Sequence, residues 1–462
     1  MKHTPALLLF AIAFFSIGPG PATATAATTA TPATPNIIYL MVDDMGWGDA
    51  GCYGQKHIQT PHIDRLAREG TRFTDVYAGA SVCAPSRSVL MTGQHLGHTR
   101  VRGNSGMVGG VGEQRRVPLA AEDVTVAMLL KQAGYATGMT GKWGLGEPDT
   151  AAIPNRKGFD EWFGYLNQQH AHNYYTDYLW KNTERVTLKG NLNGQTKEYS
   201  HDLFAEFTLD FVRRHRAGKF FLYLPWTMPH GKYVVPNLES YADKDWPADY
   251  KVHAAMVTRL DRDLGRLMAL LRELGLDEKT IVFFCSDNGG VDRREGVLDS
   301  VGPFRGKKGV QTEGGLRVPM IARWPGRVAA GRVSQAPWYF ADVLPTLCEI
   351  GGAKVTSRVD GVSVLPTILG REQPELNARM MYWEQYSGGF QQAVRWGKWK
   401  GHYVPAGDTF ELHDLTTDQM EAMNVAAQQP AVVRQMRDFM AAAHVPSPNW
   451  TTNASPKNSK KK

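Results

Sequence analysis

Two pairs of adjacent polar residues in this 462-residue chain have the chemistry of a metal site. Asp43 and Asp44 directly follow one apolar run, and Asp287 and Asn288 follow another almost as closely. Their side chains offer carboxylate and amide oxygens, and no cluster of histidines or cysteines stands beside them in the sequence. Such hard donors suit Ca²⁺ or Mg²⁺ rather than zinc, so the sequence predicts a divalent cation of that kind.

Two basic side chains follow further apolar runs and are expected to join the same site. Lys142 follows a weak run at 135–140, and His230 stands a few residues after a strong run at 219–224. The imidazole of His230 titrates near neutral pH, which makes it a candidate general acid. Because ligands of open α/β sheets bind beyond the carboxyl ends of the strands, all of these polar groups are expected to converge.

The apolar runs predict the elements that carry these residues. Continuous runs at 36–42, 219–224 and 281–285 are typical of strands buried on both faces of a sheet. Helices are predicted at 122–133 and across 256–274, where apolar residues recur at helical spacing. This alternation predicts an α/β fold, with a large, mostly parallel sheet sandwiched by helices.

The pattern changes near residue 375 and predicts a second, smaller unit. Runs at 380–386 and 391–403 are typical of antiparallel strands, and 431–443 of a final helix. We therefore expect a catalytic domain and then a C-terminal α+β subdomain. The predicted divisions are a domain at 36–375, a subdomain at 376–446 and a flexible basic tail at 447–462.

The first residues have the pattern of a secretory signal. Lys2 precedes an apolar run at 6–17, and small residues with A-x-A spacing follow at 22–26. The sequence predicts a signal peptide at 1–26 and a linker at 27–35, and hence an exported protein, periplasmic or secreted. The apolar run is shorter than the roughly 20 residues that span a bilayer, so no stable membrane anchor is expected.

Composition argues for a globular chain without a nucleic-acid partner. Hydrophobic residues make up 42% and charged residues 21%, an ordinary balance. The 52 basic residues outnumber the 45 acidic ones. Most of this excess comes from five lysines near the two ends of the chain, at positions 2, 457, 460, 461 and 462. The body of the protein is therefore nearly neutral, which does not favour binding to a polyanion.

The segment at 81–93 reads S-V-C-A-P-S-R-S-V-L-M-T-G and carries the most specific signal in the chain. Its C-x-P-S-R pattern, which contains Cys83 and Arg87, resembles the type I sulfatases, the formylglycine-dependent arylsulfatase family of the alkaline-phosphatase-like superfamily. The resemblance covers nearly the whole chain after residue 35. It includes the residues at 36–49, 140–143, 229–230, 286–289, 308–319, 324–326 and 411–415.

The resemblance implies that Cys83 does not remain a cysteine. In that family a separate formylglycine-generating enzyme oxidises this residue to formylglycine (3-oxoalanine). The hydrated aldehyde carries two hydroxyls on one carbon, so that one can attack sulfur and the other can later expel sulfate. Three cysteines would remain after this change, and no disulfide is predicted. The expected activity is hydrolysis of a sulfate ester.

The resemblance also implies roles for the other polar residues. One Ca²⁺ (with Mg²⁺ as the alternative) is expected on Asp43, Asp44, Asp287, Asn288 and the modified Cys83. Arg87, one helical turn after Cys83, is expected to reach the hydrate and the carboxylates. The remaining assignments are Lys142 and Lys308 as ligands of the sulfate oxygens, His230 as the acid for the leaving alcohol and Asp287 as a possible acceptor of the nucleophile's proton.

One position departs from the family pattern. The family reads G-K-W-H-L-G, whereas this chain has Gly144 where the histidine is expected. That histidine is thought to deprotonate the hemiacetal. Two histidines in a downstream polar and aromatic loop, His170 and His172, are candidates to replace it as a base or to bind substrate.

The substrate is left open by the sequence. Aromatic and amide residues in the loops at 174–180 and 232–250 favour a sulfated carbohydrate over a small aryl or steroid sulfate. Two alternatives remain: a phosphate or phosphonate ester hydrolase of the same superfamily, and an inactive protein that binds sulfated glycans.

Overall fold

A computed structural model describes residues 1–2, 34–106, 115–292 and 294–452 of the chain. Contacts group the described residues from Thr34 onward into one compact unit. The predicted signal peptide beyond residue 2, the linker up to residue 33 and the tail from residue 453 lie outside the described residues. Within the described part, the structure contains no helix with the length and apolar character needed to cross a bilayer.

The main sheet contains eleven strands within the described residues, and most of its central pairs are parallel. Its order is β10-β2-β9-β8-β1-β7-β3-β4-β5-β6, with β11 paired to β2. The centre, β8-β1-β7-β3, is parallel throughout, whereas β9 and the β4-β5-β6 edge introduce antiparallel pairs. The strands are β1 (Asn36–Val42), β2 (Thr71–Tyr77), β3 (Ala136–Lys142), β4 (Glu161–Tyr165), β5 (Tyr178–Lys181), β6 (Glu184–Thr187), β7 (Phe220–Pro225), β8 (Thr280–Ser286), β9 (Arg317–Arg323), β10 (Arg332–Ser334) and β11 (Trp338–Tyr339).

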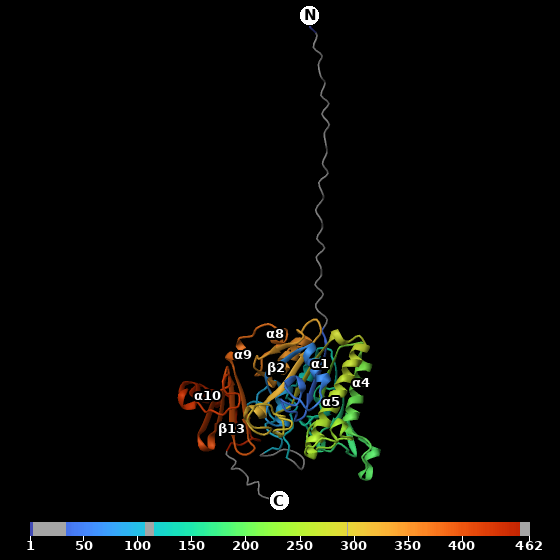
Figure 1. Cartoon of the computed structure of the whole chain (residues 1–462), viewed down its shortest axis with the longest axis horizontal. Helices are drawn as coiled ribbons and strands as arrows, with labels where there is room; N and C mark the ends of the chain where they lie inside the picture. Colours follow the sequence, from blue (N-terminus) through green and yellow to red (C-terminus); the bar gives the residue numbers. More distant parts are fainter. Residues whose placement is uncertain (3–33, 107–114, 293, 453–462) are drawn as a thin grey trace. The chain divides into compact units, whose positions relative to one another are not determined.

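Helices cover both faces of this sheet. The central strand β1 shows why: alternate residues point to opposite faces of a strand, and all seven residues of β1 are buried. One face packs against α1 (Pro61–Glu69), α4 (Ser200–His215) and α5 (Ala248–Glu273), which Figure 1 shows on one side of the molecule. The other face packs against α2 (Cys83–Thr92), α3 (Val126–Gln132) and α7 (Val343–Gly351). The predicted α/β sandwich is confirmed.

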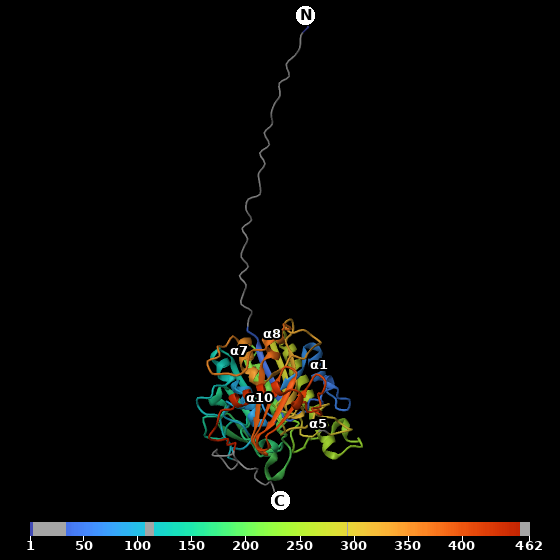
Figure 2. The ribbon, with the colours of Figure 1, turned by 90° about the vertical axis from the view of Figure 1, so that its left-hand side faces the viewer.

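The C-terminal part is a separate four-stranded antiparallel sheet with one helix on it (Figure 2). The strands follow chain order: β12 (Met380–Gln385), β13 (Gln391–Trp396), β14 (Trp399–Val404) and β15 (Thr409–Asp414). The helix α10 (Pro430–Ala443) buries Met436 and Met440 against this sheet. Three short helices, α6 (Glu313–Leu316), α8 (Leu365–Ile368) and α9 (Glu375–Ala378), lie in the connections before it.

Two details differ from the predicted elements. The helix predicted at 122–133 begins only at Val126, because the Thr125 hydroxyl caps it by accepting a hydrogen bond from the Met128 N–H at 3.3 Å. Trp450 lies in the stretch predicted as a tail, yet it is 2% exposed and donates from its indole N–H to the Arg100 carbonyl. The folded part therefore reaches at least this tryptophan. All four cysteines are described, and none forms a disulfide.

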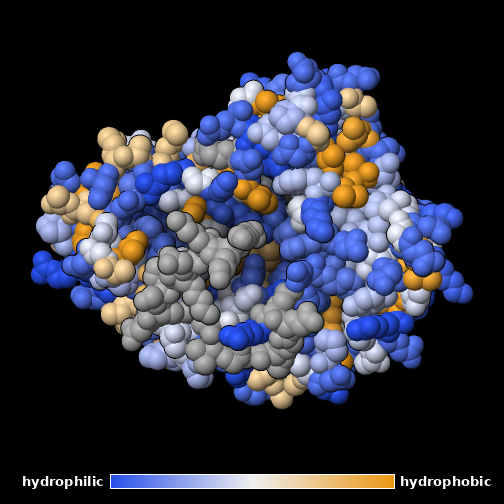
Figure 3. Space-filling view, turned by 90° about the horizontal axis from the view of Figure 1, so that it is seen from below, coloured by the Kyte–Doolittle hydropathy of each residue, from blue (hydrophilic) through white to orange (hydrophobic). Residues whose placement is uncertain are grey.

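The parallel centre of the sheet brings four strand ends to one edge. The strands β1, β7 and β8 pair in register, and β3 pairs with β7, so their carboxyl ends face the same way. The chain segments that leave these ends carry the predicted site residues. The molecule seen from below in Figure 3 has a hollow on a mostly hydrophilic face.

Candidate active site

Asp43 and Asp44 stand at the end of β1 and face one buried cluster. Adjacent side chains in a strand point to opposite faces. Here the left-handed backbone of Asp44 (φ +68°) turns the chain, so that both carboxylates reach the same cluster. Each is 1% exposed. Burial opposes ionisation of Asp43, but the charges of Lys142, His230 and Arg87 outweigh it and hold the pKa of this carboxyl well below its ordinary value.

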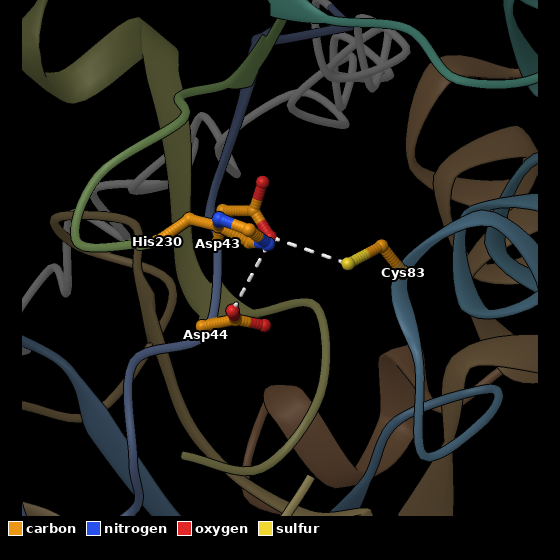
Figure 4. Close-up of side chains that lie close together, drawn as sticks. All are labelled: Asp43, Asp44, Cys83 and His230. Atoms are coloured by element: carbon orange, nitrogen blue, oxygen red, sulfur yellow. Dashed lines mark hydrogen bonds and ion pairs between the residues drawn. The ribbon is translucent and has the colours of Figure 1, made fainter. Parts of the chain in front are cut away.

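Cys83 is the first residue of α2 and lies beside these carboxylates (Figure 4). Its thiol donates to Asp43 Oδ1 at 3.4 Å and accepts from Lys308 Nζ at 3.4 Å. The thiol is 1% exposed, and burial together with the nearby Asp43 raises its pKa. The N-terminal end of a helix favours negative charge, so this position suits a group that meets an anion.

Arg87 connects Asp43 of the first polar pair with Asp287 of the second. Its guanidinium donates to Asp287 Oδ2 from Nη2 at 2.8 Å and from Nε at 3.2 Å, and lies 3.6 Å from Asp43 Oδ2. Nη1 donates to the Lys142 carbonyl at 2.7 Å. Asp287 is fully buried, and burial and the Asp43 carboxylate raise its pKa to about 6. The predicted contact between Arg87 and the carboxylates is therefore present.

The two lysines each contact one of the paired aspartates. Lys142 Nζ lies 2.7 Å from Asp43 Oδ2, and Lys308 Nζ lies 2.6 Å from Asp44 Oδ1. Lys142 comes from the end of β3 and is fully buried, whereas the side chain of Lys308 is 16% exposed. Burial opposes the charge of Lys308, but Asp44 outweighs it and raises the pKa of this ammonium.

The donor set fits a hard divalent cation. One ligand atom from each of Asp43, Asp44, Cys83 and His230 lies within 4.8 Å of all the others. Asn288 donates from Nδ2 to Asp44 Oδ1 at 2.8 Å, while its Oδ1 is buried and has no hydrogen-bond partner in the described part of the chain. A buried amide oxygen without a partner beside two carboxylates is the arrangement that a cation would complete.

His230 approaches the same cluster from the loop after β7 (Figure 4). Its Nε2 lies 3.3 Å from Asp44 Oδ2, and its Nδ1 contacts the Gly231 carbonyl. Burial lowers the pKa of His230 below its ordinary value, although Asp44 and Asp43 act in the opposite direction. The structure thus brings together all the residues that the sequence assigned to catalysis and metal binding.

A cavity of about 320 Å³ opens onto Cys83, His230 and Lys308. His172 lines it, with its ring stacked on that of His230 at a centroid distance of 4.1 Å. His170 does not line it: its Nε2 lies 2.6 Å from the Thr176 hydroxyl and its ring stacks on Tyr178. Of the two loop histidines, only His172 is placed to act in this cavity.

Four further residues line this cavity that sequence reasoning did not single out: Asn104, Arg116, Gln168 and Gln169. Asn104 Oδ1 accepts a hydrogen bond from the backbone N–H of Ala84, in the first turn of α2. Gln168 stands two residues before the predicted His170, in the same polar loop. A search of that loop for hydrogen-bond donors as well as bases would have found it. We see no sequence signal that distinguishes Arg116 from other arginines.

Two family models match the chain, and the residues that they match overlap at 306–353. Residues 35–353 match the model described as Sulfatase. Residues 306–444 match the model described as N-sulphoglucosamine sulphohydrolase, C-terminal.

Individual relatives agree with these models. Human arylsulfatase A (Homo sapiens) is 34% identical over 424 residues, which cover 86% of this chain and 79% of the relative. N-acetylgalactosamine-6-sulfatase of Canis lupus familiaris is 33% identical over 422 residues, which cover 86% of this chain and 76% of the relative. Among solved structures, Ps i-CgsB in complex with k-i-k-neocarrahexaose superposes with a TM-score of 0.79 at 29% identity, covering 91% of this chain and 95% of that one.

Proposed function

This chain belongs to the sulfatase family and is a sulfuric ester hydrolase, and we propose that it removes sulfate from a sulfated carbohydrate with a nucleophile made from Cys83. The observation that carries the proposal is the cavity of about 320 Å³ onto which Cys83, His230 and Lys308 open together. The buried carboxylates of Asp43 and Asp44 lie directly behind these side chains.

Cys83 itself is a poor nucleophile in this setting. Burial raises the pKa of its thiol, so the reactive thiolate is scarce. Family membership instead supports conversion of Cys83 to formylglycine by a formylglycine-generating enzyme. The hydrate of that group supplies one hydroxyl that can attack sulfur and a second whose loss of a proton allows sulfate to leave.

Asp43, Asp44, Asp287 and Asn288 would hold the metal, for which Ca²⁺ is our first choice and Mg²⁺ the second. A bound divalent cation draws negative charge from the sulfate group and lowers the pKa of a neighbouring hydroxyl. Arg87 keeps Asp287 and Asp43 in place by its hydrogen bonds to the first and its ion pair with the second. In this arrangement Arg87 is a positioning residue for the carboxylates.

Lys308 and Lys142 supply positive charge where the sulfate group would lie. Lys308 reaches both Cys83 Sγ and Asp44, so its ammonium stands between the nucleophile's position and the metal's carboxylates. The N-terminal end of α2 adds its own favourable field for an anion. Fixed donors of this kind stabilise the charge that develops as the sulfur–oxygen bond breaks.

Two stacked histidines are placed to move protons. We assign His230 to protonation of the leaving alcohol, because it opens onto the cavity and contacts Asp44. His172 is our candidate for the base that Gly144 cannot supply. Burial and the adjacent His230 lower the pKa of His172 to about 3, which keeps its ring neutral but makes it a weak base, so the assignment rests on its position in the cavity and its stacking on His230.

The preference for a carbohydrate is supported by relatives and by a second cavity. One relative acts on N-acetylgalactosamine 6-sulfate by its name, and one solved neighbour was crystallised with a neocarrahexaose. A cavity of about 310 Å³ adjoins the first, since Asn104 lines both. Its walls include the aromatic rings of Trp450 and Tyr386 and the buried Arg102, side chains that suit the face and hydroxyls of a sugar.

We also propose that the protein acts outside the cytoplasm. The support for this comes from the sequence alone, through the pattern of positive charge, apolar run and small residues at 1–26. Fusion of residues 1–35 to a reporter enzyme that is active only after export tests it. A reporter that stays inactive would contradict the proposal.

A substrate panel tests the proposed function. The protein is produced together with a formylglycine-generating enzyme, and mass spectrometry of the Cys83 peptide measures its conversion. Release of inorganic sulfate is then compared among sulfated mono- and disaccharides, an aryl sulfate and an aryl phosphate. We expect the largest kcat/KM for a sulfated sugar. Phosphate release faster than sulfate release would favour the phosphatase alternative, and no turnover of any sulfate by the converted protein would contradict the proposal.

A further inference from the structure

Gln168 occupies the space next to Gly144, the position where this chain departs from the family pattern. Gly144 has a left-handed backbone (φ +76°), and a Cβ atom added to it would lie 2.4 Å from Gln168 Nε2 and 2.9 Å from Cδ. Contacts this close do not occur between real side chains. A side chain at position 144 would therefore require the carboxamide of Gln168 to move from the place it has here.

The Nε2 donor of this carboxamide is buried without a partner among the described residues. Gln168 is 3% exposed, and its Nε2 has no hydrogen-bond partner among the described residues. It lines the cavity of about 320 Å³ together with Cys83, His230 and Lys308. A buried amide donor that stays unpaired costs free energy, so native proteins pair almost all such groups with protein, water or ligand.

The backbone on both sides of Gln168 is held in place. The N–H of Gly144 donates to the Leu166 carbonyl at 3.1 Å, before Gln168 in the chain. After it, the N–H of Gln169 donates to Asn167 Oδ1 at 2.7 Å, and Asn167 Nδ2 donates to Glu147 Oε1 at 2.8 Å. These contacts hold the backbone that carries Gln168, so the loop itself needs little reorganisation when a ligand arrives.

We propose that Gln168 is a substrate-binding residue that donates a hydrogen bond from Nε2 to an oxygen of the sulfate group, and that Gly144 leaves room for it. This inference rests on the proposed function, because it assumes a sulfate ester in the cavity. Gln168 and Lys308 line the same cavity, and two donors together suit the oxygens of an anion. A carboxamide does not titrate near neutral pH, so Gln168 can hold the sulfate but cannot act as its base.

Replacement of Gln168 by methionine tests the proposal, because methionine has a similar length and no donor. We expect kcat/KM for sulfate ester hydrolysis to fall about 10²-fold, the size found when one fixed donor is removed from an active site. The matched control is Gln392→Met: Gln392 is 5% exposed and lies in β13 of the C-terminal sheet. The control should change kcat/KM less than about twofold, because it removes a buried carboxamide outside the cavity.

A double-mutant cycle tests the role of Gly144. Gly144→Ala adds the Cβ atom that meets Gln168 and also strains the left-handed backbone, so it should lower kcat/KM at least about as much as Gln168→Ala does. In the Gln168→Ala background the same change should cost less than about threefold, because only the backbone strain remains. Effects that multiply independently would overturn the claim that Gly144 makes room for Gln168.

Binding of inorganic sulfate separates failure of this inference from failure of the proposed function. Calorimetry or thermal shift with sodium sulfate should show binding by the wild-type protein that weakens at least about tenfold in Gln168→Met. This readout needs no turnover, so it also applies if none of the tested esters is cleaved. Equal sulfate affinity and equal kcat/KM in wild type and Gln168→Met would overturn the inference and leave the sulfatase activity untouched.

Discussion

Two buried clusters of charged side chains differ in how completely their polar atoms are paired. The junction cluster (Glu313, Arg317, Lys400 and Glu421) connects α6 and β9 to the C-terminal sheet. Glu313 accepts from Arg317 Nε at 2.7 Å and from Lys400 Nζ at 3.1 Å, and its backbone N–H donates to Glu421 at 2.8 Å. None of the four residues has a side-chain atom among the buried polar atoms without a partner.

The active site is buried to the same degree but is not complete in itself. Asn288 Oδ1 and Gln168 Nε2 lack partners within the described residues.

The two clusters also differ in the direction in which the pKa of a buried carboxyl is shifted. Burial opposes ionisation of Glu313, but Arg317 and Lys400 outweigh it and lower its pKa to about 2. Burial and Asp43 instead raise the pKa of Asp287 to about 6, so the nearby cations offset the burial of this carboxylate less fully than Arg317 and Lys400 offset that of Glu313. A buried cluster whose polar atoms are all paired has a structural role. A buried cluster with unpaired polar atoms beside a cavity is suited to bind a ligand and a cation.

The largest expected effect of a single change is at Cys83. Cys83→Ala should lower kcat for sulfate release at least about 10⁴-fold, because it removes the only source of the proposed nucleophile. The two residues that contact the thiol keep other partners, because Asp43 still pairs with Lys142 and Lys308 still pairs with Asp44. The thermal midpoint should therefore change little. Cys348→Ala in α7 is the matched control and should keep kcat within about twofold. A Cys83→Ala protein that still turns over would contradict the assignment.

Removal of the metal should come next in size. Chelation should abolish sulfate release and lower the free energy of unfolding by up to about 4 kcal/mol, the linkage expected when the cation is present at a thousand times its Kd. Differential scanning calorimetry with and without added Ca²⁺ measures this shift. In Asp44→Asn the calcium-dependent shift should shrink, since one carboxylate ligand becomes a neutral amide. A calcium-dependent shift of the same size in wild type and Asp44→Asn would count against these ligands.

For a substitution in the junction cluster, the comparison predicts a lower free energy of unfolding and an unchanged catalytic rate. Lys400→Met would leave two fully buried carboxylates, Glu313 and Glu421, without one of their cations. Breaking a buried ion pair in this way costs about 3 kcal/mol. Urea denaturation should report this loss, while kcat of the folded variant stays within about twofold of wild type. A large fall in kcat with unchanged stability would reverse the assignment of this cluster.

Sequence patterns were sufficient for the centre of the fold and the charged part of the site. The predicted runs at 36–42 and 281–285 correspond to β1 and β8, because strands buried on both faces must be apolar along their whole length. The polar pairs Asp43–Asp44 and Asp287–Asn288 directly follow these strands, so the geometry of a parallel sheet predicted that they would converge. The family resemblance then assigned Cys83, Arg87 and Lys308 to the site. Their spacing in the sequence alone does not indicate that they lie together.

Other parts depend on contacts between distant segments and could not be predicted. The strands β4, β5 and β6 are short and partly exposed, so they lack the continuous apolar run that marks β1. Gln168 stands in a polar loop that the sequence marks, but its place beside Gly144 depends on contacts between separate segments and is seen only in the structure. For the same reason the sequence could not choose between His170 and His172. Their rings point in different directions: that of His170 stacks on Tyr178, and that of His172 stacks on His230.

Acid should weaken the junction cluster in a defined pH window. The pKa of Glu313 is lowered in the folded state to about 2, below its ordinary value of 4.5. The folded state therefore binds fewer protons than the unfolded state between these values, and stability falls as pH falls. Between pH 4.5 and 3.5 this carboxylate should account for about 1 kcal/mol of the loss. Glu313→Gln cannot titrate, so its unfolding free energy should decline less steeply by that amount. Parallel pH curves for the two proteins would contradict the assignment.

The smallest expected effect comes from a lysine two residues from Lys400 that lies at the surface. Lys398 pairs with Asp414 at 2.6 Å, a shorter distance than any in the junction cluster's lysine pairs, but its side chain is 48% exposed. Water and salt screen such a pair, so Lys398→Met should cost only about 0.5 kcal/mol, and less at high ionic strength. Urea denaturation of Lys398→Met and Lys400→Met side by side separates distance from burial as the source of stability. If the two substitutions cost the same, then burial and complete pairing do not explain the junction cluster, and the contrast with the active site loses its basis.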